Sequence, residues 1–251
     1  MSEEKQGSVL DALIALERTE LARYCEDISV DGAIAQTATL KLKKGQSLWS
    51  SKGCLLAYRG IDWTLKVPGG AGKALGRMMS GEGVTLTHIV ANQDDAKVVL
   101  AANQPGRLAS WDLSRGSIIC TSGSFVAALG DVDISVTMAR SAGAALFGGA
   151  GLFLQQLSGE GIALVHGSGD FVEQTLGAGE KILVSTGNLA VFSAEVSYGV
   201  RRTGGCLNTG GCLKSMFGGE GIFMTELTGP GWVMMQSLKK VTAARRQAGA
   251  Q

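Results

Sequence analysis

The chain has 251 residues, and its 23 Lys and Arg against 22 Asp and Glu give a formal net charge of +1. This balance argues against a broad basic surface, so nucleic-acid binding is not expected. The 37 glycines against 3 prolines favour many short strands joined by tight turns. The start, Met1 to Lys5, has no apolar run, and the five cysteines lack paired spacing. The sequence therefore predicts no signal peptide and a cytoplasmic protein with reduced thiols.

The segment from Ser8 to Tyr24 predicts a helix. Ser8 is a suitable N-cap, Asp11 follows at the capping-box position, and apolar residues then recur at near-helical spacing. We assign residues 1–30 to this N-terminal helical region. Two interpretations stay open: the helix packs on the body of its own chain, or it docks on another subunit or a partner.

Short strands follow the helix. Alternating or apolar runs separated by glycine-containing turns predict strands over Ala38–Leu42, Ser47–Ser50, Cys54–Tyr58 and Ile61–Val67. Similar orders of turns and strands return twice further along the chain.

A Gly-x-Gly turn that leads into an apolar run is written three times. Its central glycines, Gly83, Gly151 and Gly221, recur at intervals of about 70 residues. Gly161 and Gly231 belong to a second glycine pair that follows in the later two copies. We predict an all-β domain over 31–240, built of three units at about 31–104, 105–167 and 168–240, with 241–251 as a tail. We expect a pseudo-threefold axis and one continuous core.

Each unit has a glycine-rich insert just before its Gly-x-Gly turn. Loops normally run over the surface, yet these inserts carry large apolar side chains. They form the candidate interaction surface: Leu75, Met78, Met79, Leu146, Phe147, Leu213, Met216 and Phe217.

The motifs Gly-Glu-Gly-Ile-Phe from Gly219 and Leu-Thr-Gly-Pro-Gly-Trp-Val from Leu227 carry a resemblance. Together with the earlier Ser-Gly-Glu-Gly copies, they resemble the altered inheritance of mitochondria protein twenty-four family over about residues 31–238. The resemblance implies three fused units like the subunit of the trp RNA-binding attenuation protein, in a sandwich or double-stranded β-helix arrangement. It implies no established activity, and a role in mitochondrial membrane organisation belongs to fungal relatives.

One polar set could gather on the predicted axis. His88, Gln156 and Glu226 each lie five residues after a repeated glycine, so a threefold axis would bring them into a polar or metal-binding centre. The alternative is that each is an ordinary strand residue. The Gly69–Ala74 stretch lacks the spacing of a phosphate loop, and Cys206 with Cys212 lacks a second pair for zinc.

These observations leave two function classes. The first is a non-enzymatic scaffold or interaction protein that self-associates or contacts a protein partner or a membrane surface, without a cofactor. The second is a small-ligand-binding or catalytic β protein with an internal pocket. A recognisable nucleophile, acid–base or metal motif is absent from the sequence, which favours the first.

Overall fold

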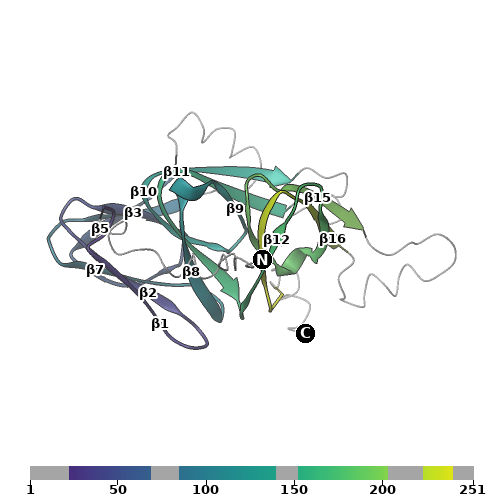
Figure 1. Ribbon diagram of the computed structural model, residues 1–251. Coiled ribbons are helices and arrows are strands. Elements are labelled where there is room, and N and C mark those ends of the chain that lie inside the picture. Colours follow the sequence, from purple (N-terminus) through teal and green to yellow (C-terminus); the bar gives the residue numbers. More distant parts are fainter. Residues whose placement is uncertain (1–22, 69–84, 140–151, 203–222, 240–251) are drawn as a thin grey trace, which may run out of the picture.

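The computed structural model describes residues 23–68, 85–139, 152–202 and 223–239 (Figure 1). These residues form strands and two short 3-10 helices, so the predicted all-β class is confirmed. Residues 8–22 of the predicted helix and the 241–251 tail lie outside the described residues. The β domain includes Asp27, because the strand that begins there pairs with the next one.

The first part of the chain, residues 27–101, is called segment one. Its strands are β1 (Asp27–Asp31), β2 (Thr37–Leu42), β3 (Ser47–Ser50), β4 (Leu55–Arg59), β5 (Ile61–Lys66), β6 (Leu86–Ala91) and β7 (Ala96–Ala101). The predicted strands in this region match β2 to β5 closely. Strand β7 pairs antiparallel with β2 and β4, and β6 pairs antiparallel with β3 and β5.

Segment two, residues 106–168, uses longer strands. They are β8 (Gly106–Asp112), the 3-10 helix η1 (Leu113–Arg115), β9 (Ile118–Thr121), β10 (Phe125–Ala139) and β11 (Leu152–Ser168). The second half of β11 pairs with β8 and the start of β10, and its first half pairs with β9 and the end of β10. This is the pairing order of segment one, with β10 in place of β4 and β5, and β11 in place of β6 and β7.

Segment three, residues 171–236, follows the same order. Its elements are β12 (Phe171–Leu176), β13 (Lys181–Ser185), the 3-10 helix η3 (Thr186–Asn188), β14 (Leu189–Ser193), β15 (Ser197–Arg202), β16 (Phe223–Thr228) and β17 (Gly231–Gln236). Strand β17 pairs with β12 and β14, and β16 pairs with β13 and β15.

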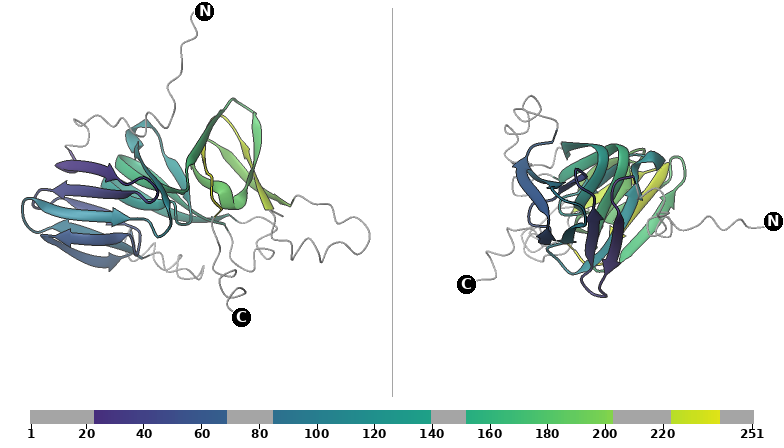
Figure 2. Two further views of the ribbon diagram at one scale, coloured as in Figure 1. Left: turned by 90° about the horizontal axis from the view of Figure 1, so that it is seen from below. Right: turned by 90° about the vertical axis from the view of Figure 1, so that its left-hand side faces the viewer.

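Two strand pairings join the segments in a row. Strand β10 of segment two pairs with β3 of segment one, and β14 of segment three pairs with β9 of segment two. The result is a long sheet in the order β12-β17-β14-β9-β11-β10-β3-β6-β5, with β8 also on β11. Figure 2 shows segment one at one end of the molecule and segment three at the other.

The core is divided into three clusters of buried residues that cross the segment boundaries. The cluster of segment one includes Val126 and Leu164 of segment two, and the cluster of segment two includes Val191 and Met234 of segment three. Each segment therefore buries apolar surface against its neighbour, which accounts for a stable fold built of short strands.

Paired glycines let β10 and β11 bend without breaking. Gly130 lies opposite Gly161, and both have positive φ, at 97° and 159°. A Cβ on Gly161 would meet the carbonyl oxygen of Leu129, so the close approach of the two strands requires glycine there. Gly161 therefore lies inside a continuous bent strand, where the sequence predicted a turn.

The three segments, as far as they are described, form an open row, and their strands make one long sheet with a four-stranded sheet (β1-β2-β7-β4) and a three-stranded sheet (β13-β16-β15). Among them, β4 pairs with β7 and β13 pairs with β16, and no pairing joins segment one to segment three. The pseudo-threefold axis stays a prediction.

Candidate functional site

The structure does not test the predicted insert surface. The eight apolar residues proposed for it, Leu75, Met78, Met79, Leu146, Phe147, Leu213, Met216 and Phe217, lie outside the described residues. The same holds for the turn glycines Gly83, Gly151 and Gly221. Gly231 is described: it begins β17 with a φ of 138°, and a Cβ there would meet the side chains of Ser193 and Val196.

The three residues of the predicted polar centre occupy matching places in their own segments. Each lies opposite the middle of the second strand of its segment, counted without β1: His88 opposite Trp49, Gln156 opposite Ile119, and Glu226 opposite Leu183. The sequence equivalence among them is therefore reproduced by the strand register.

The structure does not bring these three side chains together. Strands β10 and β3 lie between β11 and β6. The residue of β11 in line with His88 across the sheet is Ala163, and Gln156 lies seven residues from it along β11, so Gln156 and His88 are far apart. Glu226 is in a separate sheet and forms an ion pair with Lys181 at 3.4 Å. The His88 ring packs on Trp49 with ring centroids 4.5 Å apart. Burial, with the nearby charge of Lys66, lowers the pKa of His88.

The strongest candidate for an interaction surface in the described residues is the pair of strands β4 and β5. Each pairs along one edge only among the described strands, and each exposes large apolar side chains. These exposed residues are Leu56, Tyr58, Trp63 and Leu65. We call this set the edge surface.

Strand β4 has two structural equivalents in the chain. All three strands shift register after their first residue, between Leu55 and Ala57 in β4, Phe125 and Ala127 in β10, and Leu189 and Val191 in β14. Leu56, Val126 and Ala190 therefore occupy the same position. Val126 and Ala190 are 0% exposed, whereas Leu56 is 63% exposed.

The same contrast holds two residues further along. Ala128 in β10 and Phe192 in β14 are 0% exposed, whereas the equivalent Tyr58 in β4 is 53% exposed. In β10 and β14 this position faces the second strand of the preceding segment. No described segment precedes segment one, and the same apolar positions face outward on β4.

The edge surface could not have been found from residue type alone. The sequence pattern of residues 54–58 predicts an ordinary strand, and its apolar residues would be expected in the core. Its register shift and its place at the end of the row are what expose it. The usable signal would have been the predicted order of three units, in which the first unit follows none of the others.

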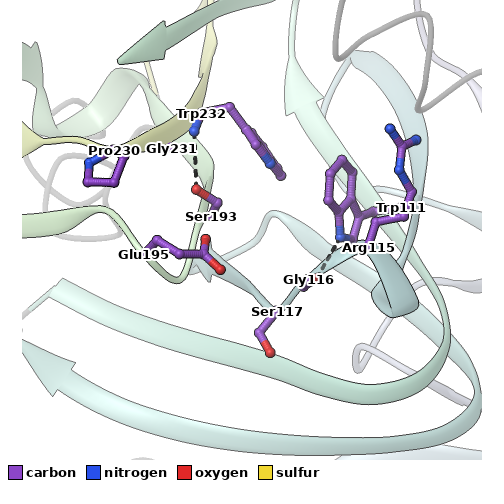
Figure 3. A pocket seen from close by; sticks show the side chains of 9 residues that line it. All are labelled: Trp111, Arg115, Gly116, Ser117, Ser193, Glu195, Pro230, Gly231 and Trp232. Atoms are coloured by element: carbon purple, nitrogen blue, oxygen red, sulfur yellow. Dashed lines mark hydrogen bonds between the residues drawn. The ribbon is translucent and has the colours of Figure 1, made fainter. Parts of the chain in front are cut away.

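A shallow recess lies where segments two and three meet (Figure 3). It has a volume of about 300 Å³. Its lining residues are Trp111, Arg115, Gly116, Ser117, Ser193, Glu195, Pro230, Gly231 and Trp232.

Aromatic packing gives this recess its shape. The rings of Trp111 and Trp232 have centroids 4.7 Å apart at 47°, and the guanidinium carbon of Arg115 lies 5.3 Å from the Trp111 ring centroid. The Trp111 Nε1 donates to the carbonyl of Gly116 at 2.8 Å, and the Trp232 amide donates to Ser193 Oγ at 3.1 Å. The arrangement suits stacking and ionic contact with a small ligand.

Other chemistry is sparse in the described part of the chain. It holds no group of three His, Cys, Asp or Glu side chains placed to bind a metal. The thiols of Cys25, Cys54 and Cys120 are buried, and burial raises the pKa of the Cys54 thiol to about 11. A helix long and apolar enough to cross a membrane was not found among the described residues.

Comparisons with known proteins place the chain among uncharacterised relatives. An uncharacterised protein of Streptococcus pyogenes serotype M6 is 28% identical over 208 residues, which cover 79% of this chain and 80% of that protein. A crystal structure of a protein from Streptococcus pyogenes aligns with a TM-score of 0.69 at 24% identity. That alignment covers 89% of this chain and 96% of the other, and it shows a shared fold.

The family comparison agrees with the resemblance drawn from the glycine motifs. The model described as mitochondrial biogenesis AIM24 matches residues 28–238, which is nearly the whole described β structure. The chain belongs to the AIM24 family.

Proposed function

We propose that this protein is a non-enzymatic interaction protein whose working surface is the edge surface of β4 and β5. The observation that carries the proposal is the contrast between equivalent positions. Leu56 and Tyr58 are exposed where Val126, Ala128 and Phe192 are fully buried.

Edge strands with exposed apolar residues invite association. An edge strand presents unpaired backbone N–H and C=O groups, and natural proteins normally protect such edges with charges, bulges or covering elements. In segment one the β4 edge keeps a register shift and one charged residue, Arg59, but also two large apolar side chains. The proposal is that another protein surface covers them in the working state.

A repeated building unit supports this interpretation. The three segments share one pairing order, and in segments two and three the strand equivalent to β4 is covered by the segment before it. We take the segments to be copies of one unit, so that segment one is the copy for which the described residues supply no covering neighbour.

A paired serine variant tests the proposal. Leu56→Ser with Trp63→Ser removes exposed apolar area and should leave the circular dichroism spectrum and melting temperature nearly unchanged, because neither side chain is buried. Sedimentation velocity over a range of concentrations should show association by the wild type and its loss in the variant. Vesicle flotation of both proteins runs alongside. A wild type that stays monomeric and binds no vesicles would contradict the proposal, and flotation that depends on these residues would redirect it to a membrane surface.

The recess of Trp111 and Trp232 supports a second candidate, small-ligand binding. Two indole rings with Arg115 and Glu195 offer stacking and both signs of charge. Its described lining contains no His or Cys, so ligand binding is favoured over nucleophilic catalysis there. Quenching or shift of tryptophan fluorescence on titration with a small-molecule library, lost in Trp232→Phe, would favour this candidate.

A further inference from the structure

The chain uses the same junction twice to join its segments. In each case the strand with the early register shift pairs antiparallel with the second strand of the preceding segment, β10 with β3 and β14 with β9. One strand with the early register shift and one second strand take part in neither junction. At the start of the row, β4 has a free edge, and at its end β13, the second strand of segment three, has a free edge among the described strands.

We propose that β4 of one copy pairs antiparallel with β13 of a second copy, so that the protein associates head to tail. This inference rests on the proposed function and names the partner as another copy of this chain. The partner is argued from continuity with the two internal junctions, since β13 is the second strand that pairs with no following segment among the described residues.

The pairing has to join two molecules. Segments one and three lie at opposite ends of the row, and β5 and β7 are seen far from β15 and β16 in Figure 1 and Figure 2. The strands that carry the free edges, β4 beside β7 and β13 beside β16, belong to these two ends. A contact inside one chain would need the row to close on itself.

The internal junctions fix the register of the new one. Their central facing pairs are Ala128 with Trp49 and Phe192 with Ile119. Tyr58 holds the place of Ala128 and Phe192 in β4, and Leu183 holds the place of Trp49 and Ile119 in β13. Tyr58 therefore faces Leu183 in the proposed junction. Tyr58 is 53% exposed and Leu183 is 47% exposed, so the pairing would cover two exposed apolar side chains at once.

A hydroxyl group strengthens both internal junctions. It belongs to the residue just after β3 and to the last residue of β9, and it donates to a carbonyl just before the register shift, from Ser51 to Phe125 at 2.6 Å and from Thr121 to Leu189 at 2.8 Å. The place in segment three belongs to Ser185, the last residue of β13, which also carries a hydroxyl. Its acceptor across the proposed junction is the carbonyl of Leu55. The free edges allow this junction, and the exposed apolar pair and the Ser185 hydroxyl fit the register carried over from the internal junctions.

The two ends of such a junction are different surfaces. Association is heterologous, and copies add in one direction into a ring or an open chain. This property gives the proposal a test that ordinary twofold dimerisation would fail.

The experiment uses charge to disable one end at a time in the full chain. Tyr58→Lys disables the β4 end and Leu183→Lys disables the β13 end, and both positions are exposed, so each variant should fold. Val30→Lys is the matched control, because Val30 is 43% exposed on β1, at the opposite edge of the same sheet as β4. Leu56→Lys serves as a second variant of the β4 end. Circular dichroism verifies folding, and sedimentation velocity measures assembly.

The expected results are specific. The wild type and Val30→Lys form species larger than the monomer, and each end variant alone loses them. An equimolar mixture of Tyr58→Lys and Leu183→Lys regains a dimer and nothing larger, because each partner supplies one intact end. A monomeric wild type, assembly by a folded end variant alone, or a mixture without dimer would overturn the proposal. If the wild type is monomeric but binds vesicles through Leu56 and Trp63, the edge surface remains the working surface, redirected to a membrane, and this inference fails.

Discussion

Thr121 offers a direct measure of what an internal junction contributes to stability. Its side chain is 3% exposed, and its Oγ1 lies 2.8 Å from the carbonyl oxygen of Leu189 and 3.1 Å from that of Ala190. Thr121→Val keeps the shape of the side chain and removes the hydroxyl. Because the hydroxyl has one hydrogen, it serves the two carbonyls of segment three in alternation or as a shared bond.

The loss follows from the cost of a buried acceptor without its donor. We expect Thr121→Val to lower the free energy of unfolding by about 1–3 kcal/mol. Thr121→Ser keeps the hydroxyl and removes one methyl, so it should cost about 1 kcal/mol. Thr175→Val, on an exposed position of β12, should change the value by less than about 0.5 kcal/mol.

Urea unfolding followed by circular dichroism measures these differences as shifts of the midpoint at constant slope. The expected order of stability is wild type, then Thr121→Ser, then Thr121→Val. If Thr121→Val is as stable as Thr175→Val, the hydroxyl does not hold the junction, and the role assigned to Ser185 loses its basis.

Three further predictions follow from single sites. Gly161→Ala should lower the free energy of unfolding, measured with urea, by about 2–3 kcal/mol, because its Cβ would meet the Leu129 carbonyl. Gly199→Ala has open space around it and should lower it by under about 0.5 kcal/mol. Equal losses would contradict the close approach of the strands at Gly161. The Cys54 pKa of about 11 lowers its thiolate fraction about 100-fold relative to a pKa of 9.0. With Cys206 and Cys212 replaced by serine, the native protein should therefore resist a thiol reagent at pH 8 that labels the unfolded chain at once. Fast labelling of the native protein would show that a thiol is accessible. The lowered pKa of His88 means that the unfolded chain takes up a proton first as pH falls through 6.5, so the stability that neutral His88 contributes above that pH is lost below it. A nuclear magnetic resonance titration, with the His88 signal assigned by comparison with His88→Gln, should give a midpoint under 6.5. A midpoint above 6.5 would refute the lowered pKa.

The sequence predicted the local structure well where turns are marked by glycine. Strand β3 was predicted at its observed bounds, and β2, β4 and β5 within a residue or two, because each run of alternating residues ends at a turn residue. The prediction of a turn at Gly161 was wrong. Gly161 faces Gly130 of β10, and this pair of glycines bends the two strands without ending their pairing. Glycine content alone does not separate the two outcomes.

The candidate surface needed the structure for a different reason. Leu56 and Tyr58 have apolar equivalents, and apolar type predicts burial. Whether they are buried depends on which segment lies beside β4, and that neighbour is set by pairings far apart in the chain. The gathering of His88, Gln156 and Glu226 failed to appear for a related reason. The three residues have matching places in their segments, but His88 and Gln156 lie on strands separated by two others, and Glu226 lies in a different sheet.

The head-to-tail junction is the central claim, and a site-specific disulfide tests it most directly. Facing residues in an antiparallel pair have Cα atoms about 4.5–5.5 Å apart, within the range that a disulfide spans. In a background with Cys206 and Cys212 replaced by serine, Tyr58→Cys and Leu183→Cys are prepared as separate proteins, mixed and mildly oxidised. We predict a covalent dimer from the mixture, little from either protein alone, and little from Val30→Cys mixed with Leu183→Cys. A dimer that forms equally in the control mixture, or no dimer in the Tyr58→Cys and Leu183→Cys mixture, would contradict the junction.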